Sequence, residues 1–160
     1  MKTVEFLPAD IHDAAALATL RVAAMRQSLE HIGRFDPERA RDRFLSNYSP
    51  EHTCHVEEDG VRIGCIVVKP HALGLLLEHL YIHPDYQNRG LGSAVLVKVL
   101  AFADAADQAL RAGVLRESAA NRFYLRHDFL LMEETEWDLH YARPCLSDRS
   151  TALATLTLPP

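Results

Sequence analysis

The chain of 160 residues has the length of one ordinary domain, and 48% of its residues are apolar while 24% are charged. A chain of this length can bury roughly 70% of the surface that it exposes when unfolded, which is enough for a substantial core. Its formal net charge of −5 argues against a general nucleic-acid-binding protein, which would carry a basic face or stripe.

The sequence offers no sign of a membrane span or a secretory signal. No stretch approaches the roughly 18 apolar residues that cross a bilayer, and the N-terminal MKTVEFLPADIHD lacks the apolar core of a signal peptide. The three cysteines, Cys54, Cys65 and Cys145, are few and odd in number, which argues against a disulfide framework. We therefore expect a cytoplasmic protein that does not bind membranes.

The first part of the chain predicts a strand, two helices and a hairpin. Residues 3–7 alternate weakly before a proline, which is typical of a short strand, and apolar residues at helical spacing follow from Asp10 to Gly33. Asp36 followed by Pro37 is a typical helix start, and we expect that helix to end near Tyr48. Asp59-Gly60 lies between two β-rich runs, a pattern that predicts a tight hairpin.

The second part alternates strands and helices. The nearly continuous apolar run LGLLLEHLYI predicts a strand inside the sheet, and the helix after Gly90 has an apolar face that includes Leu91, Val95, Val99 and Phe102. Residues 109–117 predict a fifth strand and residues 118–127 a helix capped by Ser118. Residues 129–143 predict one or two further strands with a turn around Glu134–Glu136.

These elements define a mixed α/β fold in one domain. The order is β-α-α-β-β-β-α-β-α-β-β, and the helix between the fourth and fifth strands implies a parallel pair within an otherwise mostly antiparallel sheet. We expect six to seven strands and about four helices in residues 1–143. Residues 144–160 are small and polar without a clear period, so we expect a loosely packed or disordered tail.

Nine histidines raise the question of a metal site. His79 and His83 are four residues apart, but in a strand this spacing spans about 13 Å, too far for one ion. Cys54 and His55, with His52 nearby, have no second half elsewhere in the chain. We therefore expect no metal ion.

Gly90 and Gly92 stand where a helix begins, and three anion-binding patterns compete there. The phosphate-loop pattern G-x-x-x-x-G-K-[ST] is missing, and the dinucleotide pattern fails because Val95 stands where a small residue is needed and HPDYQNR separates strand from glycines. The third pattern, Q-x-x-G-x-G from Gln87, follows a strand and opens a helix. There backbone amides and the helix dipole converge on an anion such as a pyrophosphate, glycines let it approach, and Arg89 adds charge at the rim.

The segment LLLEHLYIHPDYQNRGLGSAVL resembles the acetyl-coenzyme A binding motif of the GCN5-related N-acetyltransferases, the GNAT superfamily. A second segment, SAANRFYLRHDF, resembles the later N-x-x-A-x-x-F-Y-x-x-x-G-F pattern of that family. The matching residues are Ala120, Phe123, Tyr124 and Phe129. Glu117 stands where the family usually has Asn, and Asp128 where it often has Gly, so these two departures bear on cofactor contacts near the fifth strand.

The resemblance implies the GNAT fold, with the cosubstrate acetyl-coenzyme A in a V-shaped opening where the parallel strands splay apart. The peptide-like pantetheine arm would pair with the fourth strand, where one N–H near Leu80 or Tyr81 would polarise the thioester carbonyl. The pyrophosphate would lie on the amides of Gln87 through Gly92. The cofactor-binding residues that we expect are Leu80, Tyr81, Ile82, Gln87, Asn88, Arg89, Gly90, Leu91, Gly92, Ser93 and Tyr124.

The resemblance also implies direct acetyl transfer to an amine, for which the protein must align the amine, remove a proton and protonate the leaving thiolate. Tyr124 is the usual candidate for the acid, although the same residue fits a tyrosine packed against the sheet. Glu78 interrupts an apolar run, and burial beside the cofactor would make its carboxylate a useful base; it also fits an exposed glutamate or a partner of Arg or His. His79, on the opposite face of the strand, is the second choice, and a base relayed through water remains open.

We therefore expect an acetyl-coenzyme A dependent N-acetyltransferase acting on a primary amine of a small molecule, an amino acid or a protein. The alternative is a non-catalytic acyl-coenzyme A sensor or regulatory protein on the same fold, which would need neither Glu78 nor Tyr124. Residues 21–36, which wall the acceptor side in this family, contain Arg21, Arg26 and Glu30, so their charges do not select one acceptor. Exposed strand edges near the C-terminus allow a homodimer.

Overall fold

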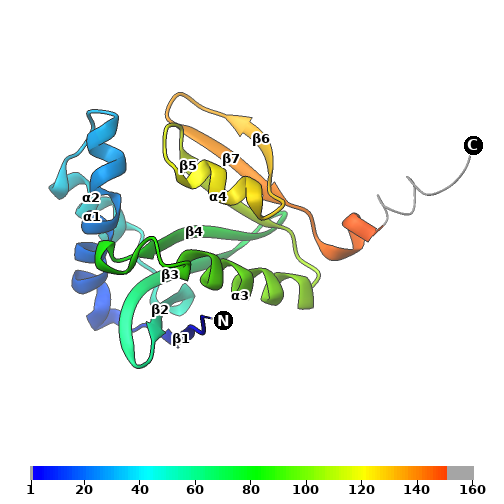
Figure 1. Cartoon of the computed structure of the whole chain (residues 1–160), viewed down its shortest axis with the longest axis horizontal. Coiled ribbons are helices and arrows are strands. Elements are labelled where there is room, and N and C mark those ends of the chain that lie inside the picture. Colours follow the sequence, from blue (N-terminus) through cyan, green and yellow to red (C-terminus); the bar gives the residue numbers. More distant parts are fainter. Residues whose placement is uncertain (1, 151–160) are drawn as a thin grey trace, which may run out of the picture. The chain divides into compact units, whose positions relative to one another are not determined.

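Strands and helices follow one another in the order that the sequence predicts, in a computed structural model that describes residues 2–150 (Figure 1). The strands are β1 (Glu5–Pro8), β2 (Thr53–Glu58), β3 (Val61–His71), β4 (Gly74–Ile82), β5 (Leu110–Leu115), β6 (Leu130–Glu134) and β7 (Asp138–Arg143). The α-helices are α1 (Ala14–His31), α2 (Pro37–Ser46), α3 (Leu91–Ala105) and α4 (Ala120–Arg126). Short 3-10 turns are η1 (Ile11–Asp13), η2 (Pro50–His52) and η3 (Pro84–Tyr86).

The seven strands form one open sheet in the order β1-β2-β3-β4-β5-β7-β6. The pairs β1–β2, β2–β3, β5–β7 and β6–β7 are antiparallel, whereas β4 and β5 are parallel, with Leu75–Leu77 opposite Leu110–Ala112. Helix α3 makes the crossover that a parallel pair requires. The predicted mixed α/β fold with a parallel pair between the fourth and fifth strands is thereby confirmed.

The described chain divides into two compact units. The first contains the described residues up to Val68 together with Glu78–Leu96, and therefore includes β1, β2, α1, α2 and the loop that opens α3. The second contains Lys69–Leu77 and the described residues from Val97 onward, and therefore includes β5, α4, β6 and β7.

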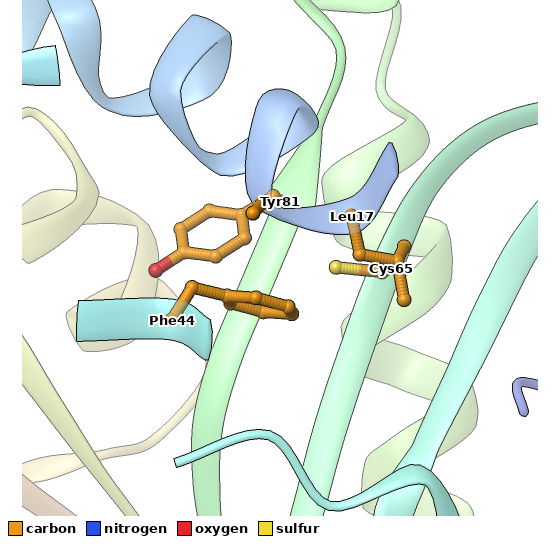
Figure 2. Packing of buried hydrophobic residues seen from close by; sticks show 5 residues of the cluster. Leu17, Phe44, Cys65 and Tyr81 are labelled. Atoms are coloured by element: carbon orange, nitrogen blue, oxygen red, sulfur yellow. The ribbon is translucent and has the colours of Figure 1, made fainter. Parts of the chain in front are cut away.

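The core of the first unit lies where α1 and α2 pack on strands β3 and β4. Leu17 and Ala18 from α1, Phe44 from α2, Cys65 from β3 and Tyr81 from β4 are all buried. Figure 2 shows the rings of Tyr81 and Phe44 beside one another, with Leu17 next to Cys65. Burial raises the pKa of the Cys65 thiol to about 12, so this cysteine is a neutral core side chain.

Local signals explain several element boundaries. The Asp36 carboxylate accepts a hydrogen bond of 3.1 Å from the Arg39 amide, so Asp36 caps α2 and Pro37 stands at its first turn, as predicted. Asp59 and Gly60 have φ angles of +52° and +79°, the pair of left-handed residues that a two-residue hairpin turn requires. The predicted hairpin between β2 and β3 is confirmed.

Two details of the sequence prediction are wrong. Ser118 does not cap α4, because the N-cap residue is Ala119; the Ser118 hydroxyl instead accepts from the Ala120 amide at 3.1 Å, in the turn before the helix. Phe102 is 63% exposed, although helical spacing places it near Leu91 and Val95. Leu91 and Val95, which stand on either side of Phe102 around the helix axis, are 1% and 0% exposed, so exposure changes along α3 and not only around it.

The second unit contains a cluster of charged side chains, Asp104, Arg143 and Arg149, in addition to its apolar core. The Arg143 guanidinium donates two hydrogen bonds to Asp104 of α3, at 2.7 and 3.1 Å, and Arg149 donates a third at 2.5 Å. The Ser147 hydroxyl donates to the Asp107 carboxylate at 2.7 Å. Residues 144–150 of the predicted tail therefore contact the end of α3, while residues 151–160 lie outside the described part of the chain.

Candidate functional site

The loop that follows β4 is held by its own side chains. After the strand ends at Ile82, the His83 ring accepts a hydrogen bond of 3.1 Å from the Asp85 amide and opens the η3 turn. The Gln87 side-chain amide then reaches back and donates to the Ile82 carbonyl at 2.8 Å. Gln87 therefore ties the start of the loop to the end of the strand.

Two residues of this loop have the left-handed backbone conformation. Asn88 and Gly90 have φ angles of +61° and +76°, and left-handed residues in such a loop turn successive N–H groups toward one point. The first hydrogen bond of α3 runs from the Ala94 amide to the Gly90 carbonyl at 3.2 Å. The amides of Leu91 and Gly92 precede it and cannot be satisfied within the helix.

Space and charge at the loop fit a phosphate-bearing ligand. A Cβ placed on Gly90 would meet no atom within 4 Å, so the backbone there is open to approach. The positive end of the α3 dipole adds to the field of the amides. Arg89 is exposed, lies over the Tyr86 ring at 5.7 Å, and pairs with Glu58 of β2 at 3.2 Å. The residues present therefore fit an anion such as a pyrophosphate.

The last part of β4 carries the other residues that the sequence singled out. Tyr81 and Ile82 are buried, whereas Glu78, His79 and Leu80 are partly exposed. The Glu78 side chain is 27% exposed and that of His79 is 14% exposed. Their nearest charged atoms, Glu78 Oε2 and His79 Nε2, are 4.0 Å apart, at the limit of an ion pair and longer than a hydrogen bond.

A buried polar network joins α1 and α2 to this strand. Arg21 Nε donates to the Tyr81 hydroxyl at 3.0 Å, and Arg21 Nη1 donates to the Ala40 carbonyl at 2.6 Å. The Tyr81 hydroxyl also lies 2.8 Å from His79 Nδ1, and the His79 ring packs against Phe44 with centroids 5.4 Å apart. His79 and Tyr81 therefore both face α1 and α2.

Burial dominates the electrostatics of this network. It raises the pKa of Tyr81 to about 12, although the Arg21 charge and hydrogen bond act in the opposite direction. The hydroxyl is therefore neutral over the physiological range. Sequence reasoning considered Arg21 only as a wall of an acceptor pocket, whereas the residue is only 7% exposed and lies in the core of the first unit. Its spacing could have indicated this burial, because Arg21 follows Leu17 by four residues and therefore lies on the same face of the helix.

Tyr124, the predicted acid, belongs to the second unit. It is buried in α4, with its ring edge-on to Phe129 at 5.2 Å and stacked near Tyr141 at 6.3 Å. This environment holds the ring in one orientation. The role of Tyr124 as proton donor stays a prediction, as do the cofactor contacts expected from Leu80 through Ser93.

Sequence reasoning missed Asn121, which fixes the turn between β5 and α4. Its amide group lies within 3.1 Å of the carbonyl oxygens of Leu115, Arg116 and Ser118, and its oxygen accepts from the Tyr141 hydroxyl at 2.8 Å. Such a set of partners, spread over two strands and a loop, leaves no local signal in the sequence.

Asp128 follows α4 at the position where the resembling pattern often has glycine. Its φ angle is +67°, so the chain keeps the left-handed conformation without the glycine. Aspartate tolerates this conformation better than most residues, which explains why the departure is compatible with the turn.

Two other features of the described chain bear on function. An open hollow of about 580 Å³ lies along α2, lined by Asp36, Glu38, Arg39, Asp42, Arg43 and Ser46. It is lined by both acidic and basic side chains, so its charge selects no acceptor. Within residues 2–150, no group of three or more His, Cys, Asp or Glu side chains could hold a metal ion, and no helix is long and apolar enough to cross a membrane.

The described sheet is open and mixed with a parallel β4–β5 pair, and the loop Gln87–Gly92 lies between its fourth strand and the crossover helix, an arrangement that suits an α/β protein with an anion site at that helix N-terminus. The model of the acetyltransferase (GNAT) domain matches residues 49–130, half of the sequence. The chain therefore belongs to the GNAT family of acetyltransferases.

Solved structures of acetyltransferases have a similar fold. The chain is similar to the PaiA N-acetyltransferase from Thermoplasma acidophilum in complex with coenzyme A, with a TM-score of 0.73 and 18% identity over 89% of this chain and 99% of that one. An acetyltransferase from Thermus thermophilus has a TM-score of 0.69 and 22% identity, covering 90% and 99%. The ribosomal-protein-S18-alanine N-acetyltransferase from Escherichia coli has 0.65 and 20%, covering 91% and 94%.

At sequence identities of 18–22%, these matches show a similar fold. A comparison with curated protein sequences finds no significant match.

Proposed function

We propose that the chain is an acetyl-coenzyme A dependent N-acetyltransferase that acetylates a primary amine of a small molecule, an amino acid or a protein. Membership of the GNAT family supports acyl transfer, and the PaiA enzyme of similar fold was solved with coenzyme A. We also propose that residues 1–143 form one catalytic domain. We further propose a cytoplasmic location, with which three free cysteines are consistent.

The observation that carries the proposal is the loop from Gln87 to Gly92. Its left-handed residues Asn88 and Gly90, the open space at Gly90 and the start of α3 together form a site for a pyrophosphate. Arg89 supplies a positive charge beside it. A loop of this kind recognises the phosphates of coenzyme A through backbone groups, which requires no particular side chain.

When bound, acetyl-coenzyme A supplies an activated acetyl group as a thioester. Glu78 accepts a proton from the acceptor amine, either directly or through water, and Tyr124 donates a proton to the departing thiolate. Backbone N–H groups near Leu80 and Tyr81 stabilise negative charge on the carbonyl oxygen. The remaining task of the protein is alignment, since a correctly placed amine attacks a thioester without a covalent enzyme intermediate.

Thiol release with a panel of primary amines, combined with calorimetric titration of coenzyme A, tests the proposal. We expect micromolar to millimolar binding of coenzyme A and turnover with at least one amine class. Binding without turnover would favour a non-catalytic sensor on the same fold. Failure of both coenzyme A binding and turnover would remove the proposal.

A matched pair of glycine variants tests the loop itself. Gly90 and Gly33 both have positive φ, +76° and +70°, and both have open space where a Cβ would stand. Gly90→Val and Gly33→Val should therefore incur similar backbone strain, roughly 1–2 kcal/mol. We expect Gly90→Val alone to weaken coenzyme A binding by about tenfold or more, because its side chain occupies the space that the phosphates need. Equal affinities in the two variants would contradict this assignment.

A further inference from the structure

Three side chains from α1 and β4 form a continuous line of polar contacts inside the first unit. Arg21 Nε lies 3.0 Å from the Tyr81 hydroxyl oxygen, which lies 2.8 Å from His79 Nδ1. Arg21 and Tyr81 are 7% and 8% exposed, so water does not compete freely for these bonds. The line ends at the His79 ring, whose Nε2 lies 4.0 Å from Glu78 Oε2.

The protons in this line can be assigned from what each group can do. A guanidinium only donates, so the Tyr81 oxygen accepts from Arg21. In the described part of the chain, the polar atoms in contact with that hydroxyl are Arg21 Nε and His79 Nδ1. A buried O–H needs an acceptor, and Arg21 cannot be one. The Tyr81 hydroxyl therefore donates to His79 Nδ1.

The direction of this hydrogen bond fixes the state of the histidine. Because Nδ1 accepts, it carries no proton, and the proton of the neutral ring must be on Nε2. Protonation of Nδ1 would remove the acceptor of the buried Tyr81 O–H. A buried hydroxyl without an acceptor is costly, which disfavours the imidazolium form of His79.

Charges around the pair have opposing effects. Arg21 of α1 and Arg43 of α2 both act on the Tyr81 hydroxyl, and a cationic His79 would add a third positive charge to the same region. Cys65 of β3, which also faces Tyr81, is neutral because burial raises its pKa to about 12. Glu78 favours a cation on His79, but its side chain is partly exposed, so solvent weakens that attraction.

We propose that Arg21 and Tyr81 hold His79 as a neutral ring with its proton on Nε2, which makes His79 a positioning residue that presents its N–H dipole to the Glu78 carboxylate across 4.0 Å. Of the two residues of β4 that are candidates for the base, Glu78 then accepts the proton of the amine. The tautomer follows from the two partners of the Tyr81 hydroxyl, Arg21 Nε and His79 Nδ1. The positioning role rests on the proposed acetyltransferase function.

Nitrogen-15 NMR of the free protein tests the tautomer without any assay of activity. The ring nitrogens of His79, assigned with a His79→Gln variant, should show a protonated Nε2 and an unprotonated Nδ1 at about pH 7. In Tyr81→Phe, we expect a mixture of the two tautomers, because the acceptor role of Nδ1 is lost. Tyr141→Phe removes the hydroxyl of a buried tyrosine in the second unit and should leave His79 unchanged.

A protonated Nδ1 or an imidazolium in the wild-type protein at neutral pH would overturn the proposal. This measurement decides the question even where the Tyr81→Phe variant fails to fold. Because it uses the protein without substrate, its failure is distinct from failure of the proposed acetyltransferase activity.

Kinetics with an accepted amine test the positioning role. His79→Gln keeps an N–H donor, so we expect kcat/KM within about tenfold of wild type and an unchanged acidic limb of the pH profile. His79→Ala, which removes the donor, should lower kcat/KM further while keeping that limb. If both variants lost activity equally and the acidic limb disappeared, His79 would be the base and the positioning role would be wrong.

Discussion

Tyr124 permits a direct test of proton donation because its ring is already held by neighbouring aromatic side chains. Tyr124→Phe keeps this packing and removes only the hydroxyl. We expect kcat to fall by roughly 10²-fold or more, as is usual when a general acid is removed, with little change in coenzyme A affinity. Steady-state kinetics with calorimetry of coenzyme A checks both values.

Tyr48→Phe is the matched control for that variant. The Tyr48 hydroxyl donates to the Asp10 carbonyl in the first unit and has no part in the proposed chemistry. The Tyr48→Phe substitution should reduce kcat by less than about twofold. A Tyr124→Phe enzyme with the same kcat as this control would show that the leaving thiolate takes its proton from another source.

Arg21 and Arg26 lie on the same helix but should differ strongly in their effect on stability. Arg21→Ala leaves the Ala40 carbonyl and the buried Tyr81 hydroxyl without their donor, so we expect a loss of about 2–3 kcal/mol in the free energy of unfolding. Arg26 forms an exposed pair with Glu30 at 2.8 Å and lies over the Phe35 ring at 5.2 Å, and Arg26→Ala should cost at most about 1 kcal/mol. Urea denaturation of the two variants measures the difference, and equal losses would contradict a structural role for Arg21.

At the scale of elements, the turn between α4 and β6 depends on one residue with an unusual backbone conformation. Asp128 has a φ angle of +67°. Asp128→Ala should destabilise the protein by about 1 kcal/mol, because alanine tolerates the left-handed region poorly. Asp128→Gly relieves the strain but gains entropy when unfolded, so its stability should stay within about 0.5 kcal/mol of wild type.

Thermal or urea unfolding of the two Asp128 variants provides the measurement. The order of stability should be glycine near wild type and alanine below both. If alanine were as stable as aspartate, the conformation at residue 128 would not be the reason why an aspartate is accepted there.

Elements whose signals are local could be predicted from the sequence. Asp36-Pro37 at the start of α2 and Asp59-Gly60 in the hairpin depend on the conformational preferences of adjacent residues, so their positions could be predicted. The loop at Gly90 was predicted from similar preferences, strengthened by the strand before it and the helix after it. Ser118 was placed wrongly because a hydroxyl can bond to the next turn as readily as to a helix start.

Contacts between distant residues could not be predicted in this way. Arg21 and Tyr81 are 60 positions apart, and their hydrogen bond exists only because α1 packs on β4. The same holds for Arg143 and Asp104, which are 39 positions apart. The sequence therefore predicted the loop between β4 and α3, whose anion binding stays a proposal, but not the polar network that joins the preceding strand to α1 and α2.

At the scale of the whole molecule, stability should fall at both ends of the pH range for identifiable reasons. At the acidic end, three carboxyl groups have a folded pKa below their usual value of 3.8. A hydrogen bond from the Asp10 amide and the close contact of His55, whose Nε2 lies 3.0 Å from Oδ2, lower the pKa of Asp13. A hydrogen bond and the charge of Arg143 lower that of Asp104, and hydrogen bonds from the backbone and hydroxyl of Ser147 lower that of Asp107.

The sign of the acidic effect follows from linkage. In the unfolded chain these carboxyl groups take up protons near pH 3.8, whereas in the folded protein they do so only at lower pH. The stability that these carboxylates contribute is therefore fully present above about pH 3.8. It is lost as the pH falls through their pKa values in the folded protein. Asp104→Asn should lower the free energy of unfolding at about pH 7 and should make its loss at acidic pH shallower. Urea titrations at a series of acidic pH values measure this loss, and a wild-type slope in Asp104→Asn would contradict this assignment.

At the alkaline end, Cys65 and Tyr81 have the opposite shift. Burial raises both pKa values to about 12, from 9.0 for the thiol and 10.0 for the phenol. The unfolded chain therefore loses these protons first, so stability should decline from about pH 9 and continue to fall until about pH 12. Tyr81→Phe cannot ionise at this position and should make the decline shallower, even if the variant is less stable at neutral pH. Unfolding free energies measured by urea titration between about pH 7 and 11 check this, and an identical slope for wild type and variant would show that Tyr81 does not contribute to it.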